Sequence, residues 1–266
     1  MSWIWPLGAI FGRDFRIALS YRLSVLITVA STLFGVALWY FFSIAVSPNQ
    51  GGWAKGGYFG YLVTGTALMG FVNVSLHTFG RKLREDQMTG TLEVLLGSPA
   101  PATLVLFATL LWDLLVQSMQ VAFTVAAALL FGLHLHVGSI PALLLLLVLT
   151  VLVFAAIGLI AASLLLIFQR GEPVTPFVGA FFALLGGVFF PPSVLPGPLS
   201  FAAGLIPLPY ALNALRGLLL EGWTFADALP DMRVLLLFAA VLLPASMMLF
   251  PICLRTARRY GLLSTY

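Results

Sequence analysis

Polar side chains that could take part in chemistry are few in this chain, and several of them stand inside long apolar segments. Asp113, Gln117 and Gln120 recur at helical spacing in one such segment, and Asn73 and His77 form an i,i+4 pair in another. An ionisable group at membrane depth costs about 2.5–3.5 kcal/mol on insertion scales, so it normally faces protein or water. These five residues therefore either hydrogen-bond neighbouring helices or line a path for a substrate.

The sequence offers little for catalysis or metal binding. It contains no G-x-x-x-x-G-K-[ST] phosphate loop, so it cannot bind and hydrolyse ATP by that route. His134 and His136 flank Leu135, but no carboxylate or thiol stands near them, and no metal site is expected. No Ser/His/Asp grouping lies at a common depth. A membrane enzyme is thus the weaker hypothesis, and a transport or scaffold role is the stronger one.

Six long apolar segments must position these residues. Hydrophobic residues make up 61% of the chain and charged residues 8%, against about 25% charged residues in ordinary soluble domains. A helix needs about 20 apolar residues to cross a hydrocarbon core of roughly 30 Å, where its backbone must satisfy its own hydrogen bonds. We therefore predict an all-α integral membrane protein with a single transmembrane domain over residues 1–266. The expected spans are 23–46, 58–80, 104–133, 141–168, 174–190 and 234–253.

The basic residues predict the orientation of these spans. Ten of the thirteen Lys and Arg residues precede the first expected span or follow the second, fourth or sixth, and only Lys55, Arg216 and Arg233 fall in the opposite breaks. Since cytoplasmic loops retain Lys and Arg, both termini are predicted to be cytoplasmic, in a multi-pass protein of the cell membrane. Nucleic acid is not an expected partner, because the basic residues are not clustered on one face.

The N-terminal segment before the first span has its own pattern. Leu7, Phe11 and Phe15 recur at helical spacing, whereas Arg13 and Arg16 fall on the other side. This pattern predicts an amphipathic helix that lies at the cytoplasmic interface. The alternative is a charged leader to the first span.

The richest polar segment lies between the second and third expected spans, over residues 81–99. Thr89 or Thr91 can cap a short helix, and Glu93 would lie in its first turn, where the helix dipole favours negative charge. Leucines follow at helical spacing. A short helix that offers leucines and a carboxylate suits docking onto a soluble partner, although it could instead only cap the membrane face.

Residues 191–222, between the fifth and sixth expected spans, are too apolar for a free loop and yet rich in proline. The prolines forbid one continuous helix. Two half-helices broken near Pro207 would bury their apolar faces without crossing the membrane. Backbone freed at such a break is tolerated only where protein or a wet cavity covers it, so we expect this re-entrant hairpin at the outer end of a transport path.

In their order and spacing these segments resemble the permeases of type-2 ABC exporters. The match covers essentially the whole chain, and it rests on Glu85, on residues 90–93 followed by Ser98 and Pro99, and on the proline-rich segment that leads to Arg216. It implies a loop that couples to a separate ATPase, carried by Arg84, Glu85, Gly90, Thr91, Leu92, Glu93 and Leu95. It also implies a helical hairpin that re-enters the outer leaflet, marked by Pro191, Pro192, Pro207, Pro209, Tyr210 and Arg216.

The resemblance implies the membrane subunit of an ATP-driven exporter that moves a hydrophobic or amphipathic substrate, such as a drug or a lipid, outward. Its expected partners are two copies of a cytosolic ATPase subunit, a second permease copy in a homodimer, and membrane lipids. ATP and magnesium would be held by the ATPase, and no cofactor is expected on this chain. Export of a polysaccharide or lipid-linked glycan is the alternative within this architecture. A non-transporting membrane scaffold or assembly factor is the alternative of another class.

Overall fold

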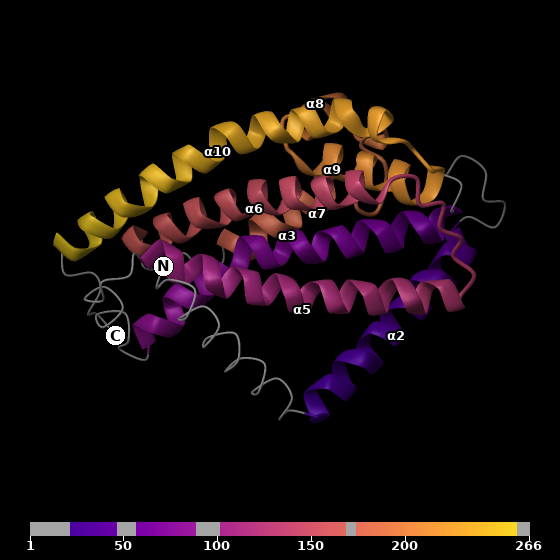
Figure 1. The fold of residues 1–266 in the computed structure, drawn as a ribbon, viewed down its shortest axis with the longest axis horizontal. Coiled ribbons are helices and arrows are strands. Elements are labelled where there is room, and N and C mark those ends of the chain that lie inside the picture. The colour runs from indigo at the N-terminus through magenta and orange to yellow at the C-terminus, as the bar shows by residue number, and fades with distance from the viewer. Residues whose placement is uncertain (1–21, 47–56, 89–101, 169–173, 260–266) are drawn as a thin grey trace.

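The computed structural model describes residues 22–46, 57–88, 102–168 and 174–259, and these form a bundle of helices (Figure 1). Among them, five helices are long and apolar enough to cross a membrane. The predicted all-α integral membrane fold is confirmed. The long helices are α2 (Arg22–Val46), α3 (Gly57–Met88), α5 (Ala102–Leu130), α6 (Ile140–Phe168) and α10 (Phe225–Arg259), and the shorter ones are α7 (Val174–Leu185), α8 (Gly197–Gly204) and α9 (Leu208–Arg216).

The central helix is α3, which packs against α5, α6, α7 and α9. Within its most apolar stretch 72% of the residues are buried, against 11% in α2 and in α5, so α3 belongs to the core and the other two face outward. Gly158 lets α6 approach α3 closely, because a Cβ atom there would lie 2.3 Å from the carbonyl oxygen of Ser75. Small residues at such crossings are how membrane helices gain close packing.

Helix α3 continues past the expected span, to Met88, so the polar segment predicted as a loop from residue 81 is helical over its first eight residues. Arg81 pairs with Glu85 at 3.7 Å, with i,i+4 spacing, and Lys82 pairs with Glu85 at 3.8 Å, with i,i+3 spacing. Such pairs favour helix over loop. Arg84 and Glu85 therefore lie on α3 itself.

Helix α7, the fifth expected span, is short. It ends at Leu185, and Gly187 then adopts a φ of +83°, a left-handed conformation that favours glycine. Its 12 residues rise about 18 Å, less than the roughly 30 Å of a hydrocarbon core. The sequence suggested an end at the proline pair after residue 190, whereas the glycine ends the helix earlier.

The segment between α7 and α10 forms the predicted hairpin of two half-helices. Helices α8 and α9 meet at a bend of 81°, at the expected break near Pro207. The Tyr210 hydroxyl donates a hydrogen bond to the carbonyl of Gly204 at 2.9 Å and so ties one half-helix to the other. A π-helical turn, Gly217–Glu221, continues α9. The hairpin lies at one end of the bundle, at the right of Figure 1.

Helix α10 begins at Phe225, nine residues before the expected span. Thr224 donates hydrogen bonds from its backbone nitrogen and its hydroxyl to the Asp227 carboxylate, at 2.9 and 2.7 Å, which caps the first turn. Three prolines lie within this continuous helix, and it bows along α6 (Figure 1). The predicted N-terminal amphipathic helix lies outside the described residues.

Candidate functional site

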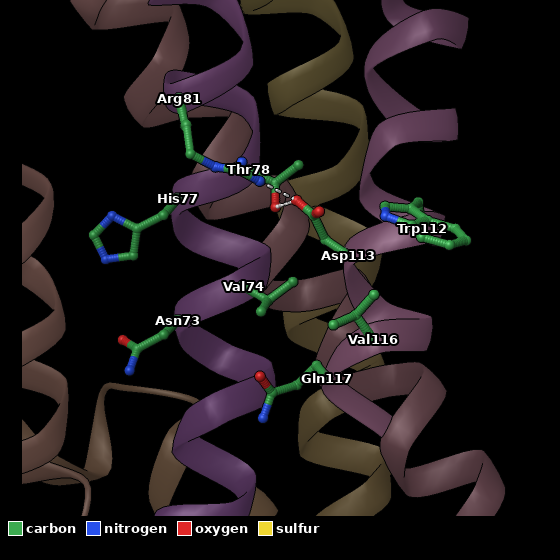
Figure 2. Close-up of a pocket in the computed structure, with 9 residues that line it drawn as sticks. All are labelled: Asn73, Val74, His77, Thr78, Arg81, Trp112, Asp113, Val116 and Gln117. Carbon is green, nitrogen blue, oxygen red and sulfur yellow. Dashed lines mark hydrogen bonds and ion pairs between the residues drawn. The ribbon is translucent and has the colours of Figure 1, made fainter. Parts of the chain in front are cut away.

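Helices α3 and α5 are joined by a polar cluster near the end of the bundle opposite the hairpin, here called the basic end because Arg81, Lys82 and Arg84 lie there. The Thr78 hydroxyl donates to Asp113 Oδ2 at 2.7 Å, and the Arg81 guanidinium pairs with the same oxygen (Figure 2). The Asp113 side chain is 18% exposed and spans the interface between the helices. The two helices that flank residues 89–101 are therefore tied together.

The amide of Gln117 lies one turn along α5 from Asp113 and packs directly on the backbone of α3. A Cβ atom at Gly70 would lie 2.2 Å from Gln117 Nε2, so a larger residue at position 70 would displace the amide from this place. Asp113 and Gln117 both point toward α3 from α5 (Figure 2). The helical spacing that aligned Asp113, Gln117 and Gln120 thus brings them to one side of α5.

Asn73 and His77 extend from the other side of α3, away from Asp113 (Figure 2). A Cβ atom at Gly179 of α7 would lie 3.4 Å from Asn73 Oδ1 and 3.9 Å from His77 Nε2, so this pair faces α7. The five polar residues singled out in the sequence are consequently not gathered at one point. They form two strips on opposite sides of α3.

Two neighbouring hollows lie beside α3, and each is lined by residues of both strips. The first, of about 500 Å³, extends along α3 and α5 and reaches Arg81, and the second, of about 360 Å³, lies between α2, α3 and α5. They share Asn73, Val74 and Gln117, so polar surface runs without a break along much of α3. The lining of the first hollow is Asn73, Val74, His77, Thr78, Arg81, Trp112, Asp113, Val116 and Gln117.

Arg216 holds the hairpin to the rest of the fold. Its side chain is buried, and Nη2 donates to the carbonyl oxygens of Gly187 at 3.0 Å, Tyr61 at 3.2 Å and Val188 at 3.3 Å. Its Cζ lies 3.3 Å from the centre of the Tyr61 ring, a cation–π geometry. Because two of these carbonyls follow the end of α7, the guanidinium satisfies backbone that the helix leaves unpaired. We call this contact the Arg216 clamp.

Two tyrosines of the clamp were not singled out from the sequence. The Tyr61 hydroxyl donates to the Gly187 carbonyl at 2.8 Å, and the Tyr58 hydroxyl donates to the Phe189 carbonyl at 3.1 Å. Gly65 permits this approach, since a Cβ atom there would lie 2.5 Å from the Val188 carbonyl oxygen. Two signals were available in the sequence. Tyr58, Tyr61 and Gly65 have i, i+3, i+7 spacing and so share one helix face, and Arg216 is a lone arginine in an apolar segment, where its guanidinium needs acceptors.

The comparisons with known proteins identify the family. A family model described as ABC-2 type transporter matches residues 7–220, a range that includes both hollows and the Arg216 clamp. The chain belongs to the ABC-2 type transporter family. No curated protein matches the sequence.

Family membership shows that the chain is a component of a membrane transporter and a multi-pass membrane protein. The ABC-2 domain is a permease and not itself a catalytic domain, and the family implies association with an ABC ATPase subunit. Of the residues predicted for coupling to that ATPase, Arg84 and Glu85 lie at the basic end of α3. The others, Gly90, Thr91, Leu92, Glu93 and Leu95, lie outside the described residues.

Proposed function

We propose that this ABC-2 permease is the membrane subunit of an ATP-driven exporter. A separate cytosolic ATPase, in two copies, would bind ATP and magnesium and would contact the loop at residues 89–101. A second copy of the same chain would complete the permease. Both termini and the basic end would face the cytoplasm, and the hairpin would lie in the outer leaflet of the cell membrane.

The observation that supports coupling is the tie between α3 and α5. These helices lead into and out of the loop, and the ion pair of Arg81 and Asp113, with Thr78, fastens them at the basic end. A push on the loop would therefore move both helices together rather than bend one of them. Because both hollows are lined by α3 and α5, the same movement would change the surface that a substrate meets.

The exposed surface supports a hydrophobic or amphipathic substrate. Large apolar side chains cover the outside of α2 and α5, and polar side chains of α3 and α5 line the two hollows. A molecule with an apolar body could approach through the bilayer and place its polar part in a hollow. A non-transporting scaffold would need no such polar surface at membrane depth.

The experiment replaces one carboxylate in the predicted docking loop. Glu93→Lys reverses a charge at a contact where like-charge juxtaposition can cost several kcal/mol. We expect the variant to insert normally but to lose both stimulated ATP hydrolysis and association with the ATPase. Leu92→Ala should weaken both, because it removes apolar contact.

A matched control is Glu221→Lys, which makes the same charge change on an exposed carboxylate at the hairpin end. It should leave ATPase association unchanged. If Glu93→Lys and Leu92→Ala also leave association and hydrolysis unchanged, the loop is only a connector and the coupling proposal fails.

A further inference from the structure

We propose that the hollow between α2, α3 and α5 binds the uncharged, hydroxyl-bearing headgroup of an amphiphile, with the apolar tail of the ligand left in the bilayer. We call this hollow the amide groove. The proposal rests on the proposed function, because it assigns a substrate class to the exporter. The occupant is recognised by hydrogen bonds and shape rather than by charge.

The lining of the amide groove consists of hydroxyls, carboxamides and small or apolar side chains. Among the residues that line it, none is ionisable. Helix α2 contributes hydroxyls and Trp39, α3 contributes a threonine and an asparagine, and α5 contributes two glutamines and a threonine. The polar lining residues are Ser31, Thr32, Thr66, Asn73, Gln117, Gln120 and Thr124.

The threonine hydroxyls of the groove already donate their hydrogens to backbone carbonyls, but their oxygens can still accept hydrogen bonds. The Thr32 hydroxyl donates to the Thr28 carbonyl at 2.8 Å, Thr66 donates to Leu62 at 2.8 Å, and Thr124 donates to Gln120 at 2.9 Å. Each oxygen therefore keeps lone pairs that face the groove. Such oxygens suit a ligand that brings its own O–H or N–H donors.

The carboxamides supply the complementary groups. Within the described part of the chain, the side chains of Gln117 and Gln120, which project from α5, have no hydrogen-bond partner. Each offers both donors and an acceptor, and a carboxamide left in hydrocarbon without a partner is destabilised. A headgroup with several hydroxyls is both donor and acceptor at each position, so it matches this set better than a purely accepting group does.

An anionic headgroup fits the amide groove poorly. The nearest cation along α3 is Arg81, which belongs to the first hollow and already pairs with Asp113 and Glu85. Among the residues that the structure describes, no neighbouring cation would thus be left to balance a phosphate in the amide groove. A neutral headgroup needs none.

The groove is also open to the bilayer. Helix α2 runs obliquely and diverges from α5 toward its start at Arg22 (Figure 1), and 11% of its most apolar stretch is buried. Gly35 lines the groove from α2, and a Cβ atom there would meet no atom within 4 Å. A ligand could therefore enter from the side, and a large residue at position 35 would fill its space without disturbing the packing.

The test measures lipid binding by the full chain alone in nanodiscs. The probe is a diglucosyl diacylglycerol with a photoreactive diazirine on its headgroup, and the comparison lipid is a phosphatidylglycerol with the same acyl chains and the same photoreactive group on its headgroup. Cross-linked peptides are identified by mass spectrometry. The variants are Gln117→Leu, Gln120→Leu and Gly35→Phe. The control is Ala30→Phe, which adds the same ring at an exposed position of α2 outside the groove lining.

We expect the glucolipid to label residues 31–39 or 117–124 in preference to the anionic lipid. Either glutamine variant should weaken binding about fivefold, the factor that corresponds to a net hydrogen bond of about 1 kcal/mol. Gly35→Phe should abolish the labelling and Ala30→Phe should preserve it. A melting temperature equal to that of the wild type shows that a variant is folded, and the second glutamine replaces the first if one variant misfolds.

Equal labelling by the two lipids would overturn the proposal, and so would labelling that none of the folded variants changes. A third contradicting result would be a disulfide between two copies of the Ser31→Cys variant, because it would show that a second chain covers the groove. The readout uses no ATP and no ATPase. Labelling without ATP-driven transport would reject the exporter and keep the binding site. Transport with an unlabelled groove would reject the binding site and keep the exporter.

Discussion

Replacing Arg216 tests how the hairpin is held. In Arg216→Met an apolar chain of similar length takes the place of the guanidinium, and the carbonyls of Tyr61 and Val188 lose the donor described here. The Gly187 carbonyl keeps the Tyr61 hydroxyl at 2.8 Å. The change therefore isolates what the charged fork contributes to the Arg216 clamp.

The change in the free energy of unfolding for Arg216→Met combines lost interactions with a recovered cost of burying the charge. Hydrogen bonds to a charged donor contribute about 1.5–3 kcal/mol each, and a desolvated cation–π contact contributes about 2 kcal/mol. Removing the charge returns part of the several kcal/mol that burial of an ion costs. The net loss in the free energy of unfolding should be about 2–4 kcal/mol for Arg216→Met. Arg216→Lys should lose less, because an ammonium keeps the charge but lacks the planar fork.

The assay uses the single cysteine of the chain. Cys253 is buried in α10, so a thiol-reactive dye reports when the fold opens. A loss of 2–4 kcal/mol should lower the melting temperature by on the order of 5–10 °C. Arg233→Met is the control, because Arg233 is exposed on α10 and a surface substitution usually changes stability by less than about 0.5 kcal/mol.

A double substitution sharpens this test. Tyr61→Phe alone removes one hydroxyl donor and should lose about 1 kcal/mol. Combined with Arg216→Met it leaves the Gly187 carbonyl without either donor, so the joint loss should exceed the sum of the single losses. Wild-type stability in Arg216→Met, or an equal loss in Arg233→Met, would refute the assignment of the clamp.

Three further predictions concern packing, coupling and orientation. Gly158→Ala should lower the free energy of unfolding by about 1–3 kcal/mol, measured by thermal unfolding, because the added methyl group would meet α3. Gly35→Ala should change the free energy of unfolding little, because a Cβ atom there meets nothing. Equal effects of the two substitutions would contradict the close contact of α3 and α6. Asp113→Asn removes the charge partner of Arg81. We expect this variant to insert into the membrane normally but to show reduced transport-coupled ATP hydrolysis. Unchanged hydrolysis would argue against a rigid tie between α3 and α5. With the native cysteine replaced, Glu221→Cys should react with an impermeant thiol reagent outside intact cells and Gln87→Cys should not; the reverse pattern would invert the predicted orientation.

Hydropathy and proline placement were enough to predict the helices and the hairpin, because both depend on local chain chemistry. The break near Pro207 was expected because proline lacks the donor that a continuous helix needs. The end of α7 was missed by a few residues, since the conformation of Gly187 depends on contacts distant in sequence, such as the hydrogen bond from the Tyr61 hydroxyl to its carbonyl.

The candidate site was predictable only in part. Helical spacing shows that Asp113 and Gln117 share a face of α5, but it cannot show which helix they meet. The pairing of Asp113 with Arg81 joins residues 32 positions apart, and the seat of Gln117 on Gly70 depends on the crossing of two helices. The same holds for Arg216, whose charge suggested an outer loop and whose acceptors come from α3 and from the end of α7.

The central claim is that this permease works with a separate ATPase, and ATP hydrolysis measured with and without that partner tests it most directly. The full chain should be isolated in mild detergent from the cells that make it, once under conditions that keep partners and once after they are stripped away. We predict that an ABC ATPase accompanies the chain, that the complex hydrolyses ATP, and that the stripped chain does not, because it lacks a phosphate loop. Robust hydrolysis by the stripped chain, or a preparation in which no ATPase accompanies it, would contradict the account.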